Sequence, residues 1–167
     1  MSADGRRFVV GTTDGKMIVW DLQAKSESIF RVPTGDLQGV AISGNGERVV
    51  TSVSRWLQIW DVEASQNLYW MFGSCAREEV TLGLTFAADG THFYGSGGQM
   101  WRRCRIANGR CQDVLNAPVR PGIFLGCVAI VPAFLAVPRV RCMFLDTDGK
   151  RAITACDENV IRIWTTE

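Results

Sequence analysis

The sequence has a single histidine, His92, and its six cysteines include no Cys-x-x-Cys pair. One histidine offers no Ser-His-Asp triad, and a zinc site would have to consist almost wholly of thiolates. Adjacent acidic residues occur at 78–79 and 157–158, in predicted loops where solvated carboxylates are the ordinary interpretation. We therefore expect no enzyme activity, no catalytic residue, no cofactor and no metal site.

The sequence also lacks an excess of charge of either sign and a hydrophobic run long enough to cross a membrane. The 167 residues carry 18 Lys and Arg against 17 Asp and Glu, a net charge of +1, which leaves no electrostatic footprint for nucleic acid or anionic lipid. Residues 1–10 lack the apolar core of a secretory signal. The most apolar stretch, 123–137, is shorter than the roughly 20 residues of a membrane-spanning helix. We expect no nucleic-acid partner, no membrane partner and a cytoplasmic or nuclear location.

The cysteines stand mostly in strand-like segments, at positions 75, 104, 111, 127, 142 and 156. Free cysteine is among the most buried residue types, and disulfides are rare in the cytosol. We therefore predict reduced, buried thiols.

One sequence pattern occurs four times. A Gly ends a polar turn, two apolar strands follow, and a Trp, or once a Cys, closes the second strand 15, 14, 14 and 15 residues after the Gly. The four pairs are Gly5 and Trp20, Gly46 and Trp60, Gly90 and Cys104, and Gly149 and Trp164. The first two steps between these glycines are 41 and 44 residues, which indicates an array of four-stranded units, and the third step, 59 residues, requires an insertion.

Alternating apolar residues between the turns predict fourteen strands. They span 7–12, 16–22, 29–32, 37–43, 49–53, 56–62, 68–72, 81–86, 92–96, 100–106, 111–115, 141–146, 151–155 and 160–164. The aromatic residues Trp20, Trp56, Trp60, Trp70 and Trp164 are interpreted as core.

These repeats resemble the WD-repeat family, and two copies carry the Trp-Asp pair itself, Trp20-Asp21 and Trp60-Asp61. The resemblance implies an all-β fold, a partial β-propeller of four-stranded antiparallel blades that forms an open arc rather than a closed ring. It divides the single domain, 1–167, into blade one without its inner strand (1–33), blade two (34–73), blade three (74–115), an insertion (116–138) and blade four without its outer strand (139–167).

The resemblance also implies structural roles for residues in blades one, two and four. These residues are Asp14, Trp20, Asp21, Trp60, Asp61 and Trp164. In the family a buried hydrogen-bond network links the Trp to a Ser or Thr and to a turn Asp, and in the first copy Thr12, Asp14 and Trp20 would keep part of it.

The insertion and the open arc each leave alternatives. Residues 116–138 are an extra hairpin, a buried connection, or translated intron from a mistaken gene model. An arc of this size exposes an apolar face at each end. The chain is accordingly a fragment of a larger protein, a half-ring completed by a second copy or another chain, or an arc stabilised by its insertion.

Family members hold other proteins on the loops between blades. We expect the same here, with partner contacts from Arg55, Arg77, Glu78 and Glu79 as charged loop residues without a packing role. The predicted function is a non-enzymatic protein-protein interaction scaffold. The alternatives are a docking or regulatory segment of a larger multidomain enzyme and a truncated gene fragment without independent function. A basic cluster at 102, 103, 105 and 110 predicts no nucleic-acid groove, because strand alternation separates its first two members.

Overall fold

The protein is all-β throughout the part of the chain that the structure describes. This computed structural model describes residues 1–32, 37–54, 56–72, 81–97, 100–116, 140–145, 151–156 and 160–165. Every regular element in these ranges is a strand, and none of the described residues belongs to a helix that could cross a membrane.

Fourteen strands form four antiparallel sheets, each built from strands consecutive in the chain. The first sheet contains β1 (Arg7–Gly11), β2 (Lys16–Asp21) and β3 (Ser26–Arg31). The second contains β4 (Leu37–Ile42), β5 (Arg48–Val53), β6 (Trp56–Asp61) and β7 (Gln66–Phe72). The third contains β8 (Thr81–Phe86), β9 (His92–Gly97), β10 (Met100–Arg105) and β11 (Cys111–Asn116). The fourth contains β12 (Val140–Leu145), β13 (Arg151–Cys156) and β14 (Val160–Thr165).

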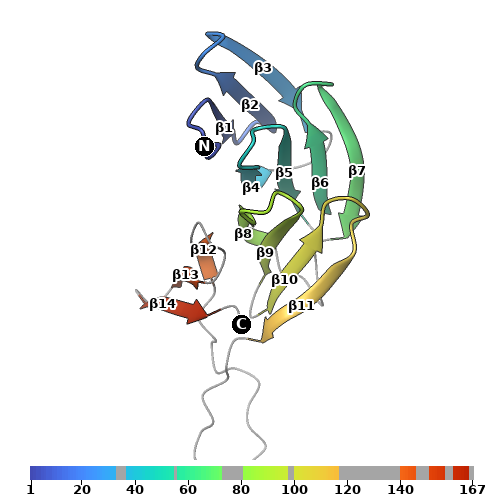
Figure 1. Cartoon of the computed structure of the whole chain (residues 1–167). Helices are drawn as coiled ribbons and strands as arrows, with labels where there is room; N and C mark the ends of the chain where they lie inside the picture. The colour runs from blue at the N-terminus through green and yellow to red at the C-terminus, as the bar shows by residue number, and fades with distance from the viewer. Residues whose placement is uncertain are drawn as a thin grey trace, which may run out of the picture.

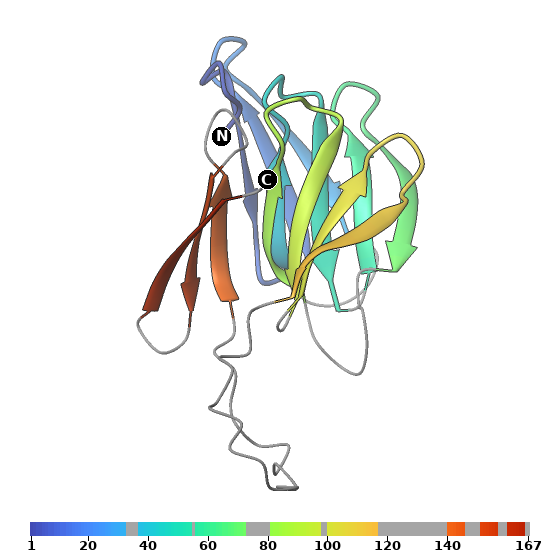
Figure 2. The same cartoon turned by 60° about the horizontal axis from the view of Figure 1, so that its bottom comes forward.

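The sheets lie side by side in an arc that is open on one side (Figure 1). Their first strands meet at the inside of the arc, where β1 contacts β4, β4 contacts β8, and β8 contacts β12. The last strands of the first three sheets, β3, β7 and β11, lie on the outside (Figure 1). Turned by 60°, the molecule shows the four sheets standing beside one another, with β12–β14 next to the third sheet (Figure 2).

The polar turn before each repeated hairpin has the same geometry in the first three sheets. The backbone N–H of Gly5, Gly46 and Gly90 donates to the carbonyl three residues earlier. All three glycines have φ between 64° and 73°, a left-handed conformation in which a side chain is unfavourable. The backbone conformation of the turn therefore favours glycine at these positions, which agrees with their nearly constant spacing from the closing residue of each hairpin.

The Asp that follows the closing Trp starts the next turn in two sheets. Asp21 Oδ1 accepts hydrogen bonds from the backbone N–H of Gln23 and Ala24, at 3.1 and 2.9 Å. Asp61 Oδ1 accepts one from Ala64, at 2.9 Å. An Asp side chain that bonds the backbone two or three residues on stabilises a turn, so the Trp-Asp pair marks the end of one strand and the beginning of the connection to the next.

Two apolar layers join the first three sheets. Between the first and second sheets the buried side chains are Met17, Val19, Phe30, Val32, Ile42, Val49, Val53, Trp60 and Val62. Between the second and third they are Val50, Leu57, Ile59, Met71, Phe93 and Cys104. Each face of the second sheet is thus covered, and β5 and β6 are accordingly buried along almost their whole length, the polar Thr51, Ser52 and Gln58 included.

All fourteen predicted strands are present, with ends that agree or differ by at most three residues. The largest difference is at β3, which begins at Ser26 although apolar alternation begins only at Ile29. Ser26 and Glu27 pair with Asp21 and Trp20 on β2, so backbone hydrogen bonding extends the strand through polar residues. Residues 117–138 of the predicted insertion lie outside the described residues.

Candidate functional site

The four residues predicted to contact partners, Arg55, Arg77, Glu78 and Glu79, lie outside the described residues. Their role stays a prediction. The structure describes the backbone of the other site residues selected from the sequence, and several of them lie on the faces of the sheets.

Asp21 joins the first sheet to the loop that follows it. It lies opposite Arg7 in the β1–β2 register, and its Oδ2 accepts from Nε of Arg6 at 2.9 Å and from Nε of Arg7 at 3.2 Å. The hydrogen bond from Arg6 and the backbone N–H of Ala24 hold the pKa of the Asp21 carboxyl well below its usual range. Arg7 also donates to the carbonyl of Gly46 at 3.1 Å, so this ion pair ties the first sheet to the second.

Asp61 repeats this arrangement in the second sheet. It lies opposite Arg48 in the β5–β6 register, and the two side chains form an ion pair with Nη1 and Oδ2 2.7 Å apart. The two Trp-Asp pairs therefore share a second function, because each Asp neutralises the Arg at the start of the preceding strand.

Trp60 is buried between the first and second sheets, with 5% of its surface exposed. Its indole Nε1 donates to Thr51 Oγ1 at 3.0 Å, and its ring meets Phe30 edge to face with centroids 5.8 Å apart. The hydrogen bond to Thr51 satisfies the one polar atom of the indole, which makes deep burial possible. Sequence reasoning missed Thr51 and looked for the equivalent bond in the first copy instead.

Trp20 occupies the equivalent position in the first sheet but is only half-buried. Its ring stacks on Phe8, the residue opposite it, with centroids 4.7 Å apart. Thr12 bonds to Asp14 in the hairpin turn, and Asp14 pairs with Lys16. The first copy thus contains the Thr12–Asp14 part of the expected network, and Trp20 takes no part in that pair.

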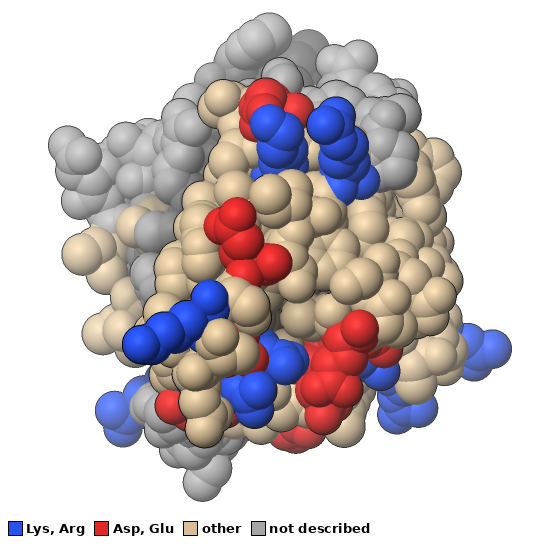
Figure 3. Space-filling model, turned by 90° about the horizontal axis from the view of Figure 1, so that it is seen from above, with Lys and Arg blue, Asp and Glu red and all other residues tan. Residues whose placement is uncertain are grey.

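The outer face of the first sheet, the side away from the second sheet, carries a group of apolar side chains together with Lys16, Glu27 and Arg31. Strand alternation places Phe8, Val10, Ile18, Trp20 and Ile29 on this side, opposite in direction to the buried Met17, Val19 and Phe30. Val10 is 40% exposed and Ile29 55% exposed. Figure 3 looks onto the side of the molecule where β3 lies in Figure 1, and basic and acidic residues stand there in several groups, in places next to one another, with uncharged residues between the groups. We call Phe8, Val10, Ile18, Trp20 and Ile29 the first outer face.

The fourth sheet also exposes apolar residues. Ile153 and Ile163 are register partners, and Ile161 stands next to them opposite Ala155. These three isoleucines are 45%, 70% and 72% exposed. We call Ile153, Ile161 and Ile163 the second outer face. The backbone of Trp164 pairs with that of Ala152 in the β13–β14 register, and its assignment to the core stays a prediction.

Two tryptophans predicted as core are not buried. Trp56 and Trp70 are 42% and 41% exposed, and they pack edge to face against each other with centroids 6.1 Å apart. That prediction was wrong because apolar alternation does not show how near a residue lies to the edge of its sheet. Trp56 begins β6 and Trp70 lies on the outermost strand, β7, so both stand near the rim of the sheet.

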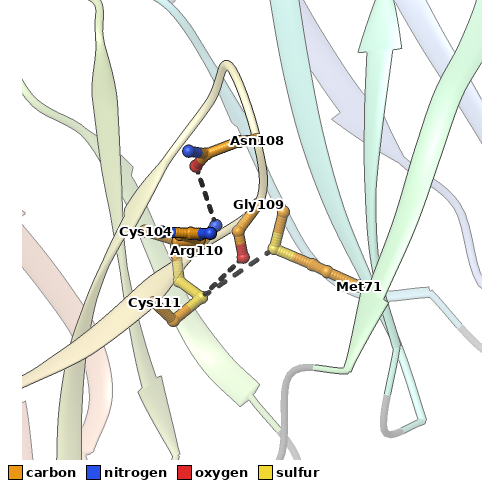
Figure 4. The surroundings of a disulfide bond; sticks show 6 residues. All are labelled: Met71, Cys104, Asn108, Gly109, Arg110 and Cys111. Carbon is orange, nitrogen blue, oxygen red and sulfur yellow. Dashed lines mark hydrogen bonds between the residues drawn. A yellow bond between two sulfur atoms is a disulfide. The ribbon is translucent and has the colours of Figure 1, made fainter.

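The prediction of reduced thiols is wrong for Cys104 and Cys111, which form a disulfide. The β10–β11 register places them directly opposite each other, with Cα atoms 4.0 Å apart. The sequence alone did not predict this bond. It forms because the register of the β10–β11 hairpin places two cysteines that are seven residues apart opposite each other. In Figure 4, Cys111 points toward Met71 of the second sheet, with Sγ and Sδ 4.0 Å apart. The disulfide thus lies against the second apolar layer.

The remaining chemistry of the described residues is limited. Within the ranges that the structure describes, no group of three His, Cys, Asp or Glu side chains converges in a way that could hold a metal ion. Compared with models of known protein families and with curated proteins, the chain matches none. The candidate functional surfaces are therefore those that the geometry of the sheets defines.

Proposed function

We propose that the protein is a non-enzymatic protein-protein interaction scaffold, built as part of a WD-repeat β-propeller. Three features support the propeller arrangement: consecutive strands in each sheet, contacts between the first strands of neighbouring sheets, and the recurrent Gly turn and closing residue. In such an array each sheet is one blade and buries its faces against the blades beside it.

The contrast between Trp60 and Trp20 is the observation that carries the proposal. Trp60 is buried because the first sheet, with Phe30, covers the side of the second sheet from which it projects. Trp20 projects from the same side of the first sheet, where no described sheet precedes it. Its half-exposed ring, with Phe8 and Ile29, forms a surface that another sheet would bury. Contiguous exposed apolar surface of this kind marks an interaction site.

The proposed occupant of the first outer face is the second outer face of another copy of the chain. Both are sheet faces that carry exposed apolar side chains, and each copy has one of each at opposite ends of its arc (Figure 1). Two copies joined head to tail at both ends would form a closed, two-fold symmetric ring with no bare face. Partner proteins would then bind to the loops of this ring.

Light scattering on a sizing column tests the proposal with the full chain. We expect twice the chain mass for the wild type, and the monomer mass for Ile29→Lys and for Ile163→Lys, which place a charge in the two contacting faces. Gln23→Lys, an exposed turn position outside both faces, adds the same charge and should remain dimeric. A folded wild-type monomer, or a dimer insensitive to both face variants, would contradict the proposal.

A further inference from the structure

The third sheet differs from the first two at the position that follows its closing residue. In the first two sheets an Arg faces an Asp, as Arg7 faces Asp21 and Arg48 faces Asp61. In the third sheet His92 faces Arg105. A basic residue therefore replaces the acidic one, and the ion pair of the repeat cannot form there.

A second replacement of the same kind lies on the same side of β10. Val19 and Ile59 stand two residues before Asp21 and Asp61, and both are buried against the following sheet. The residue two before Arg105 is Arg103, whose side chain is 42% exposed. The side of the third sheet directed toward the fourth sheet thus carries guanidinium groups where the repeat has an aliphatic residue and a carboxylate.

These residues line a cavity of about 290 Å³ whose walls are His92, Arg103, Arg105, Asn108, Arg110 and Gln112. Asp89 is the one carboxylate beside them among the described residues. Its Oδ2 lies 3.2 Å from His92 Nδ1 and 3.9 Å from Arg103 Nη2. Within the described ranges, Arg105 and Arg110 have no ion pair, and the buried Nε of Arg103 has no hydrogen-bond partner. Three guanidinium groups against one carboxylate leave an excess of positive charge and of donors.

The corresponding cavity of the first sheet, two repeats earlier, has a balanced set of charges. It has about 180 Å³ and is lined by Arg7 together with Asp21 and Glu63. Arg7 Nε lies 3.2 Å from Asp21 Oδ2 and its Nη2 lies 3.7 Å from Glu63 Oε1. The earlier cavity therefore supplies its own anions, whereas the cavity of the third sheet lacks them among its described lining residues.

We infer that the cavity lined by Arg103, Arg105 and Arg110 binds a phosphate group, either inorganic phosphate or a small phosphate monoester. A phosphate monoester carries a charge of about −1.5 to −2 at pH 7 and three acceptor oxygens. It therefore neutralises more of the excess charge than a single carboxylate. The planar fork of a guanidinium group suits two oxygens of one phosphate. The volume lies at the lower end of small-molecule sites, which run from about 300 to 1,000 Å³.

The disulfide supports this cavity from the other side of the sheet. Cys104 lies between Arg103 and Arg105, and Cys111 lies between Arg110 and Gln112. The covalent link fixes the separation of β10 and β11 at the residues from which the guanidinium groups project. Preorganised donors bind an anion more tightly, because less side-chain and backbone freedom is lost on binding.

Isothermal titration calorimetry of the full chain at low ionic strength tests the inference, with inorganic phosphate in one series and O-phosphoserine in another. We expect saturable binding at one site per chain in at least one series. Tighter binding of O-phosphoserine would identify the monoester as the ligand, and tighter binding of inorganic phosphate would identify the free ion.

Two variants and one control locate the site. Arg105→Asp restores the acidic residue of the other repeats, and Arg110→Gln removes a charge in the following turn. Each should weaken phosphate binding about tenfold or more, since a hydrogen bond to a charged group contributes about 1.5 to 3 kcal/mol. Lys25→Asp makes the same charge change as Arg105→Asp at an exposed turn of the first sheet and should leave the affinity unchanged.

Absence of saturable binding, or equal weakening by Lys25→Asp and Arg105→Asp, would overturn the inference, because general attraction of anions would then account for the result. Circular dichroism of each variant checks that it is folded. The test is independent of the proposed scaffold, since phosphate binding and chain mass are separate measurements on separate sets of variants.

Discussion

The indole of Trp60 donates a hydrogen bond to Thr51 at 3.0 Å, within the apolar layer that joins the first two sheets. At the equivalent positions of the first sheet, Trp20 has Val10 in the place of Thr51 and stacks on Phe8. Two identical Trp-Asp pairs therefore have different surroundings. The difference arises from the sheet on the preceding side, which is present for Trp60 and absent from the described residues for Trp20.

This difference predicts unequal costs for the two tryptophans. Trp60→Ala removes a buried ring and leaves a cavity, and we expect it to lower the free energy of unfolding by about 3 to 5 kcal/mol. This is a large part of the roughly 5 to 15 kcal/mol that stabilises a domain, so the yield of soluble protein should collapse. Trp20→Ala should cost less than half as much in the monomer. Urea denaturation followed by circular dichroism measures both in the monomeric Ile163→Lys variant, where no second copy covers Trp20, and equal costs would contradict the assignment of their environments.

Asp21 predicts a specific dependence of stability on pH. The folded-state pKa of its carboxyl lies below its usual value of about 3.9 in an unfolded chain, first because of the hydrogen bond from Arg6. The carboxylate therefore stabilises the fold at pH values above about 4, and this contribution is lost as the pH falls toward the folded-state pKa. Asp21→Asn retains an oxygen for the turn but removes the charge.

We expect the free energy of unfolding of Asp21→Asn to fall less steeply between pH 5 and pH 2 than that of the wild type, as measured by urea titration at each pH. Glu27→Gln is the control, because Glu27 is exposed and has no ion pair among the described residues. If the free energy of unfolding of Asp21→Asn fell with pH as steeply as that of the wild type, the contacts with Arg6 and Arg7 would not depend on the charge of Asp21.

The disulfide between Cys104 and Cys111 predicts a loss of stability on reduction. Closing a short loop restricts the unfolded chain, so we expect Cys104→Ser with Cys111→Ser to lower the free energy of unfolding by about 2 to 3 kcal/mol. Adding a reductant to the wild type should have a similar effect, and adding it to the double variant should have none. Free thiols at both positions in protein purified without reductant, detected by mass spectrometry, would contradict the bond.

Gly109 and Gly90 provide a matched pair for the contact between the second and third sheets. Both have a left-handed backbone, with φ of 65° and 64°. A Cβ at Gly109 would lie 3.1 Å from Met71 Cε and 3.3 Å from Tyr69 Cε2, whereas a Cβ at Gly90 would meet nothing within 4 Å. Gly90→Ala should cost about 1 to 2 kcal/mol for the backbone alone, and Gly109→Ala should cost more. Equal losses in thermal unfolding would show that the turn at Gly109 is not packed against β7.

Local features of the sequence were sufficient to predict most of the strands. Alternating apolar residues and the turn glycines place each hairpin, because both act over a few neighbouring residues. The prediction failed where the outcome depends on how near a residue lies to the edge of its sheet, as for Trp56 and Trp70, or on cross-strand register, as for Cys104 and Cys111. The four charged loop residues predicted to contact partners stay predictions.

The basic cluster at 102, 103, 105 and 110 shows the same difference between what the local sequence predicts and what the tertiary structure decides. Its residues are adjacent in the sequence, and alternation correctly separates Arg102 from Arg103 between the two faces of a strand. Only the β9–β10 and β10–β11 registers bring Arg103 and Arg105 beside His92 and Arg110 at one cavity.

The sequence by itself determined that the chain forms short antiparallel strands in repeated units, since the alternation, the spacing and the turn residues are local. The tertiary structure alone decided which faces are covered, which cysteines meet and which charges remain unpaired. Those properties depend on the neighbouring sheet, and the same Trp or Arg is buried, stacked or exposed according to whether a neighbouring sheet lies against it.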